Sequence, residues 1–255
     1  MVSFINFNAS KKHYMRKQLF AAAIAVTAFT ITGCDFINVE TIRGNGNVTT
    51  ETRNVSVTSR ISSHGSFDVA IIRGSSPSVK IEADANLLPY ILTDVEDGKL
   101  EIHTKDHVGL NSDHKIKVYV TTDKVDEVSL SGSGNVTSDS KLESSSHMKF
   151  GISGSGDINL EINAPSVESS ISGSGNIDLT GETKDSKITI TGDGDYKAAG
   201  LQSENAEVHI TGSGNVHVAA SVKLEVHITG SGDVGYKGSP TIEQHITGSG
   251  NIKQE

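Results

Sequence analysis

Glutamate and histidine recur two residues apart in the last third of the chain, and these residues have the clearest capacity for chemistry. Residues two apart in an extended strand point to the same side of the sheet. Neighbouring imidazole and carboxylate groups bind transition metals such as Zn²⁺ and Ni²⁺, and imidazole gains a proton near neutral pH. The pattern predicts a metal site, a pH-sensing site or a solvated polar face with paired side chains. We call it the Glu/His stripe, and its members are Glu207, His209, Glu225, His227, Glu243 and His245.

Two carboxylates form a second candidate, at Asp193 and Asp195 in the sequence Gly192-Asp193-Gly194-Asp195. Hard cations such as Ca²⁺ prefer clustered oxygen ligands. Two carboxylates are few for a Ca²⁺ site, so a structural role in hydrogen bonding is the alternative. The sequence therefore raises a cation-binding corner as a hypothesis.

Both candidates lie within or beside a short phrase, close to Gly-Ser-Gly-Asn/Asp-Val/Ile, that recurs seven times. The copies are separated by 22, 19, 19, 20, 18 and 18 residues. A near-constant period of this size is typical of a solenoid. The copies begin at Gly132, Gly154, Gly173, Gly192, Gly212, Gly230 and Gly248.

Alignment of the copies gives columns with one kind of side chain each. The residue two before the first glycine is always aliphatic, as at Leu130 and Ile152, and the next residue is always Ser or Thr. The residue four after the first glycine is apolar, as at Val136. A strand has a period of two, so the aliphatic residues point inward, and the glycines mark corners. A coil of this length holds about three short strands, which predicts an all-β fold with a parallel β-helix.

Asparagine and aspartate alternate strictly in the column three residues after the first glycine. Aspartates stacked on neighbouring strands would repel one another. An interleaved asparagine amide donates hydrogen bonds to the carboxylates above and below it. The sequence therefore predicts a structural ladder of Asn135, Asp157, Asn176, Asp195, Asn215, Asp233 and Asn251.

The first half of the chain carries strand patterns but no regular repeat. Short stretches within residues 54–124 alternate apolar and polar side chains, and Asp97-Gly98 is a two-residue hairpin signal. Weak echoes of the repeated phrase stand at residues 42–48 and 64–69. We therefore predict a lead-in over residues 34–53, a small β module or irregular coils over residues 54–124, and the β-helix over residues 125–255.

Residues 1–33 are predicted to be a signal peptide, with Met15 as an alternative start. A basic stretch precedes 14 uncharged residues, Leu19 to Thr32, which end just before Gly33-Cys34. Cys34 is the one cysteine of the chain and stands where bacterial lipoproteins are acylated. We expect a membrane anchor at Cys34, and Asp35 slightly favours inner-membrane retention over the outer membrane or cell surface.

Charge excludes nucleic acid as a partner. The chain has 22 Lys and Arg, of which four lie in residues 1–33, and 31 Asp and Glu, of which none do. The mature protein then has 18 basic and 31 acidic residues and a net charge of −13. Such a surface repels polyanions.

The repeated phrase, together with four earlier segments in the same order, resembles the auto-transporter adhesin, head GIN domain family. These segments are Ser66-Phe67-Asp68-Val69, residues 79–84, Asp97-Gly98-Lys99-Leu100 and Lys117-Val118-Tyr119-Val120. The resemblance covers about residues 55–250. It implies a right-handed β-helix, secreted or lipid-anchored in the bacterial envelope.

We therefore expect a non-catalytic envelope lipoprotein with an adhesin-like or scaffolding role and no cofactor. A glycan or an envelope protein is the expected partner, and the open end of the β-helix could pair with a second copy. The first alternative is a periplasmic protein that senses or binds metal or protons. The second is a polysaccharide-active enzyme, but the short coils leave few residues for cleft walls and the chain has no Trp.

Overall fold

Most of the described chain forms strands that stack on one another, coil after coil. The structure is a computed structural model that describes residues 39–56 and 58–255. The predicted signal peptide, Cys34 and Asp35 lie outside the described residues. Residues 40–255 form one compact unit.

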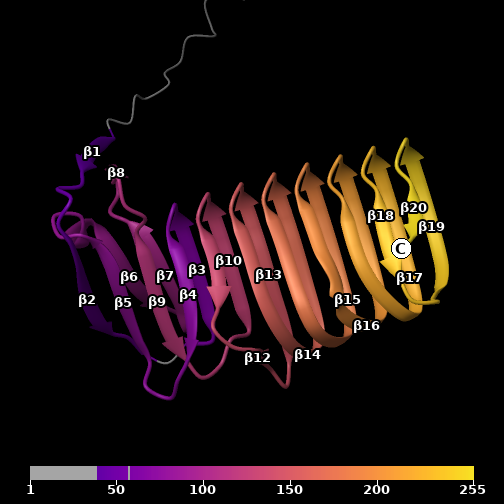
Figure 1. Cartoon of the computed structure of the whole chain (residues 1–255), viewed down its shortest axis with the longest axis horizontal. Coiled ribbons are helices and arrows are strands. Elements are labelled where there is room, and N and C mark those ends of the chain that lie inside the picture. Colours follow the sequence, from indigo (N-terminus) through magenta and orange to yellow (C-terminus); the bar gives the residue numbers. More distant parts are fainter. Residues whose placement is uncertain (1–38, 57) are drawn as a thin grey trace, which may run out of the picture. The chain divides into compact units, whose positions relative to one another are not determined.

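One face of the solenoid carries the Glu/His stripe, and we call it the Glu/His face. Its strands stack side by side (Figure 1). They pair in parallel and in register, so that each corner glycine lies beside the corner glycine of the next coil. They are β3 (Arg60–Gly65), β10 (Glu127–Gly132), β13 (His147–Gly154), the C-terminal halves of β14 (Asp157–Gly173), β15 (Asn176–Gly192), β16 (Asp195–Gly212) and β17 (Val216–Gly230), and β19 (Thr241–Gly248). The predicted parallel β-helix is confirmed, whereas its right hand stays a prediction.

The chain turns at the glycines onto a second face, which we call the Asn/Asp face. It consists of β4 (Asp68–Arg73), β11 (Asn135–Ser138), the N-terminal halves of β14 to β17, β18 (Val234–Lys237) and β20 (Ile252–Gln254). These segments also pair in parallel, coil on coil. The short β12 (Leu142–Glu143) pairs with the middle of β14, between the two faces.

The solenoid begins earlier than Val125, where the regular repeat predicts its start. β3 pairs in register with β10, and β4 with β11, so residues 60–73 already form a coil. The echo at residues 64–69 is therefore a true corner, because Gly65 lies beside Gly132. The echo at residues 42–48 is not, because it joins β1 (Glu40–Arg43) to β2 (Val48–Asn54).

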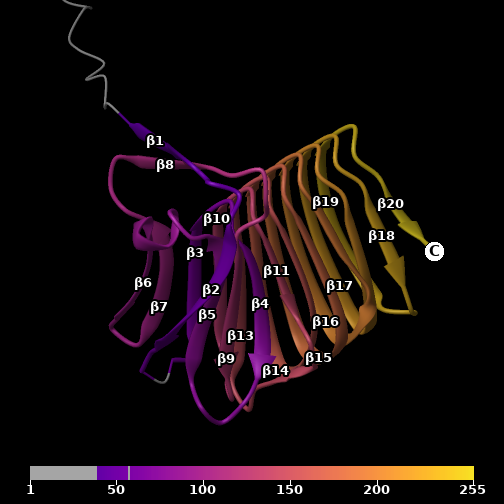
Figure 2. The same cartoon turned by 60° about the vertical axis from the view of Figure 1, so that its left-hand side comes forward.

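Residues 74–126 form an insertion between the first coil and β10 (Figure 2). Two of its strands, β7 (Lys99–Thr104) and β9 (Lys117–Thr122), still stack on that coil, because β7 pairs in parallel with β3 and β9 with β4. β5 (Ser78–Asp84) lies antiparallel between β2 and β9. The turn η1 (Leu88–Tyr90) leads into the hairpin of β6 (Ile91–Glu96) and β7, which turns at Asp97-Gly98 as predicted. β8 (Val108–Asn111) pairs with β1 in a separate sheet.

The interior is filled by the aliphatic columns that the repeat predicts. Leu130, Ile190 and Ile228 are each 1% exposed, and most of their neighbours in the column are similarly buried. The corner glycines allow the coils to approach closely. Gly192 has a φ of +121°, and a Cβ there would collide with the carbonyl oxygen of Gly173.

One polar cluster lies within this interior. The Tyr196 hydroxyl and the hydroxyls of Ser169 and Ser186 are buried, and among the described residues none of them has a hydrogen-bond partner. Burial raises the pKa of Tyr196 above its ordinary value, so the phenol stays neutral. In the part of the chain that the structure describes, no helix is long and apolar enough to cross a membrane.

Candidate functional site

The parallel register assembles the whole Glu/His stripe on three successive coils. Glu207, Glu225 and Glu243 lie side by side, and so do the three histidines. The His209 and His227 rings are stacked, with centroids 4.8 Å apart and an interplanar angle of 8°. The His227 and His245 rings are tilted by 46°, with centroids 6.2 Å apart. The predicted neighbourhood is therefore confirmed.

Hydrogen bonds and lysine ion pairs within and between the coils balance the stacked glutamates. Nε2 of His209 lies 2.7 Å from Oε1 of Glu207, and Nε2 of His227 lies 3.1 Å from Oε1 of Glu225. Lys187, one coil earlier in the glutamate column, donates to Glu207 at 2.7 Å. Sequence reasoning missed this lysine, although the repeat alignment already placed it in that column.

A second lysine pairs with the glutamates of the later two coils. Nζ of Lys223 lies 2.7 Å from Oε2 of Glu225 and 3.4 Å from Oε2 of Glu243. Its hydrogen bond, followed by that of His227, lowers the pKa of Glu225 from 4.5 to about 2. The hydrogen bonds of Lys187 and His209 also lower the pKa of Glu207. Both carboxylates are therefore ionised at neutral pH, and the stripe is a network of exposed ion pairs.

Neither predicted metal site is assembled as a cluster of ligands. Among the described residues, no group of three or more His, Cys, Asp and Glu side chains is arranged to hold a metal ion. At the other candidate site, Oδ1 of Asp195 accepts from the amide of Asn215 at 3.1 Å, which is the structural role. Metal binding by the stripe or by Asp193 and Asp195 stays a prediction.

The Asn/Asp ladder forms, although among the described residues Asn251 joins it only through its backbone N–H, which donates to Oδ1 of Asp233 at 2.9 Å. Asn176 donates its side-chain amide to Asp157 at 2.7 Å, and Asn215 donates to Asp195 in the same way. In both pairs the carboxylate belongs to the preceding coil. The second expected bond, from the amide to the carboxylate of the following coil, does not occur among the described residues. Instead, the backbone N–H of Asp233 donates to Oδ1 of Asn215 at 3.3 Å.

The ladder also has a member that sequence reasoning missed. Asn135 donates to Oδ1 of Asp68 at 2.7 Å, so Asp68 continues the alternation onto the first coil. The signal was present, since Asp68 stands three residues after Gly65, as the other members do after their own glycines. The insertion of residues 74–126 hid it.

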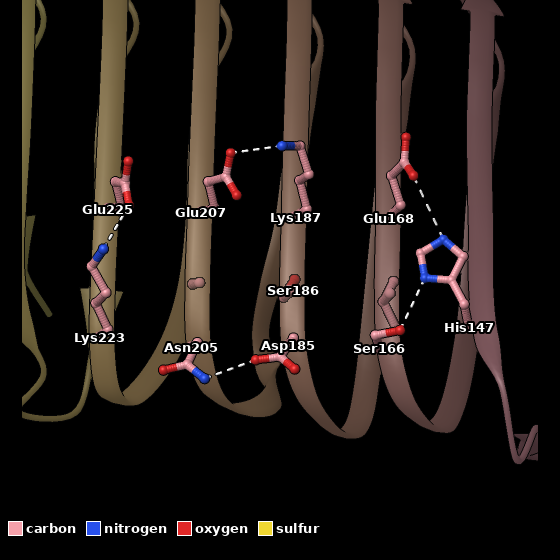
Figure 3. Close-up of a pocket in the computed structure, with 12 residues that line it drawn as sticks. His147, Ser166, Glu168, Asp185, Ser186, Lys187, Asn205, Glu207, Lys223 and Glu225 are labelled. Atoms are coloured by element: carbon pink, nitrogen blue, oxygen red, sulfur yellow. Dashed lines mark hydrogen bonds and ion pairs between the residues drawn. The ribbon is translucent and has the colours of Figure 1, made fainter.

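A shallow groove of about 360 Å³ crosses several coils beside the stripe (Figure 3). Ser186 and Ala206 are among the residues that line it, and charged and amide side chains form its two rims. The rim groups are bonded to one another, as Asn205 is to Asp185 at 2.8 Å. Because these pairs leave few free donors or charges, the groove resembles the rest of the polar surface more than a catalytic cleft.

The chain has counterparts among known proteins. Residues 58–240 match the family described as putative auto-transporter adhesin, head GIN domain. The chain belongs to this family. A search of curated proteins finds no match.

Solved structures similar to this head GIN domain include three from Bacteroides and Parabacteroides. A putative adhesin from Bacteroides fragilis has 20% identity and a TM-score of 0.79, over 84% of this chain and 100% of that one. A putative lipid binding protein from Parabacteroides distasonis has 28% identity and a TM-score of 0.70, over 85% and 100%. A putative adhesin from Parabacteroides merdae has 27% identity and a TM-score of 0.66, over 85% and 99%.

A serine–histidine pair in this head GIN domain bears on the enzyme alternative. Oγ of Ser62 lies 2.9 Å from Nε2 of His64, and Ser129 donates to the same Oγ at 2.9 Å. A serine nucleophile needs a histidine that a third group orients. Within the described residues nothing bonds Nδ1 of His64, and Ser62 is only 2% exposed. The pair therefore lacks the arrangement of a hydrolase site.

Proposed function

We propose that the chain is a non-catalytic binding protein of the bacterial envelope, adhesin-like in its mode of action. The observation that carries the proposal is the register of the coils. It places polar side chains of one kind on successive coils of the Glu/His and Asn/Asp faces. Groups repeated at strand spacing, about 4.8 Å, contact an extended ligand at many points.

Many weak contacts along one ligand sum to useful affinity without any deep pocket. Each contact after the first is intramolecular and therefore gains from a high effective concentration. The ion pairs and ladder bonds hold the side chains in place, which lowers the entropy that is lost on binding. A glycan chain or an elongated envelope protein fits this mode.

Anchoring is the second part of the proposal. Acylation of Cys34, after removal of residues 1–33, would hold the solenoid at a membrane, since acyl chains contribute about 0.8 kcal/mol per buried CH₂. Asp35 favours the periplasmic side of the inner membrane, whereas an adhesin must reach the cell surface. The family and its adhesin-like relatives support an envelope location without distinguishing these two sites.

The test compares cells that carry the chain, cells that lack it, and cells with Cys34→Ala. We expect radiolabelled palmitate to enter the wild-type protein and not the variant, and adherence to mucin-coated or cell-coated surfaces to fall in both altered strains. Equal adherence by all three strains would contradict the adhesin role. Release of new reducing ends from polysaccharides by the purified protein would instead support the enzyme alternative.

A further inference from the structure

Tyr119 is an aromatic side chain that the topology brings to the start of the Asn/Asp face. It lies on β9, outside the repeats, but β9 pairs with β4 so that Tyr119 lies directly beside Ala70. Ala70 in turn lies beside Thr137 on β11. On the other side of Tyr119, the antiparallel pairing places Lys80. The row therefore runs Lys80, Tyr119, Ala70, Thr137 along the outer surface of one sheet.

The small Ala70 side chain between two larger ones leaves a hollow. This hollow has a volume of about 350 Å³, and Tyr119, Ala70, Thr137 and Lys117 line it together with Asp68 and Asn135. That volume lies at the small end of the range for ligand pockets, which is roughly 300–1,000 Å³. The next coil does not repeat this arrangement, because Asn159 follows Thr137 in the row.

Among the described residues, the side-chain contacts that hold the Tyr119 ring come from β5. Nζ of Lys80 lies 4.3 Å from the ring centroid, a cation–π contact made from the β5 side. The phenolic hydroxyl lies 3.5 Å from Oε2 of Glu82, also on β5. These contacts fix the plane of the ring, and the flank of Tyr119 opposite Lys80 borders the hollow over Ala70.

One end of the hollow is lined by a hydrogen-bonded polar group. Asp68 accepts from the Asn135 amide at 2.7 Å and pairs with Lys115 at 2.8 Å. A carboxylate has about four acceptor positions, so Asp68 can accept further hydrogen bonds. Lys117 is paired with Glu82 at 3.3 Å. Each carboxylate here has a lysine partner, so the hollow does not present an unbalanced charge of the kind that selects an anion.

We propose that this hollow, formed by Tyr119, Ala70, Thr137, Asp68 and Asn135, is a subsite for one ring of a neutral saccharide. The apolar face of a sugar ring can pack on the flank of Tyr119, and its hydroxyls can exchange hydrogen bonds with Asp68 and Asn135. The subsite rests on the proposed binding function and specifies its ligand class. It also places a specific contact at the first coil, from which the ladder continues along the face.

The full mature protein, purified in detergent, is tested on an array that carries animal glycans and bacterial polysaccharide fragments in separate sectors. Binders are then titrated by calorimetry. Tyr119→Ala and Ala70→Gln are each expected to weaken saccharide binding by about tenfold or more, the first by removing the ring and the second by filling the hollow. Tyr119→Phe keeps the ring and should retain most of the affinity.

Asn159→Gln is the matched control, since it enlarges the same row one coil beyond the hollow. The subsite is rejected if no saccharide in either sector binds, or if Tyr119→Ala and Ala70→Gln bind as tightly as the parent. If Tyr119→Ala fails to fold, Ala70→Gln alone still tests the subsite. If cells adhere through the chain but the protein binds no saccharide, the subsite alone is rejected. If neither adherence nor saccharide binding is found, the proposed binding function is rejected too.

Discussion

The regular coils and the irregular start of the solenoid bring polar side chains together in different ways. Between β13 and β19, polar columns are matched by their own neighbours, as Lys187 matches Glu207. Between β2 and β9, inserted strands bring single side chains together that have no counterpart in the other described coils. There Ser112 donates to the buried Asp84 at 2.5 Å, and Tyr119 borders the hollow over Ala70. The repeats therefore give ordered columns of paired side chains, whereas the inserted strands give sites whose side chains occur together once in the described coils.

The largest effect is expected where the repeat constrains the backbone most. Gly192→Ala forces a non-glycine residue into a positive φ and drives its Cβ against Gly173, so we expect a loss of about 3–5 kcal/mol of unfolding free energy. In the irregular region, Gly46 has a φ of +75°, and a methyl group added there would meet no atom within 4 Å, so Gly46→Ala should cost only about 1 kcal/mol. Urea unfolding of the two variants measures the difference, and equal losses would mean that the corners are not close-packed.

The ladder provides the next test of the comparison. Asn215→Asp removes the amide bonded to Asp195 and places a carboxylate between two others, so we expect a loss of about 1–2 kcal/mol at pH 7. Asn135→Asp at the irregular end should cost less, because Lys115 already pairs with Asp68. Both losses should shrink when the carboxylates are protonated. An unchanged loss at pH 3 would show that repulsion is not the cause.

A smaller effect, of opposite sign, is expected in the interior of the regular coils. Tyr196→Phe removes a buried hydroxyl that has no partner among the described residues, so the unfolding free energy should rise by about 1 kcal/mol. Tyr236→Phe, at a half-buried position, is the control and should change little. A clear destabilisation by Tyr196→Phe would indicate that its hydroxyl is bonded to Ser169 or Ser186.

The smallest effect concerns the exposed stripe and depends on pH. The pKa of Glu225 is lowered to about 2, so its ion pairs stabilise the fold fully above pH 4.5 and lose that contribution as the pH falls toward 2. Glu225→Gln should therefore unfold slightly more easily than the parent at pH 7 and equally at pH 2. Glu204→Gln changes a residue in no described ion pair and serves as the control. NMR titration of Glu225 in the parent checks the pKa directly, and a value near 4.5 would contradict the network.

The sequence predicted the features that depend on neighbours one period away. The aliphatic columns, the corner glycines and the alternation of Asn and Asp follow from pairing in register, and a fixed period reveals that register. The hairpin at Asp97-Gly98 was equally visible, because a two-residue turn has its own signal. These are local or periodic relations, and they require no knowledge of how distant segments meet.

Most of the missed features depend on pairing across the insertion. Nothing in residues 74–126 indicates that β9 lies beside β4, so the meeting of Tyr119 with Ala70 could not be read from the sequence. Asp68 was hidden as a ladder member for the same reason. Lys223 was missed because it does not lie in the column of the glutamates. It reaches Glu225 only through the length of its side chain.

The alternation of Asp and Asn gives the molecule two different units of length. The backbone repeats with every coil, but the sequence of Asp68, Asn135, Asp157 and Asn176 repeats only with every second coil. Gain or loss of a single coil by gene duplication or deletion would bring two aspartates or two asparagines together. Gain or loss of two coils would leave the alternation intact. Selection should therefore favour gain or loss of an even number of coils. The backbone alone would not impose this rule.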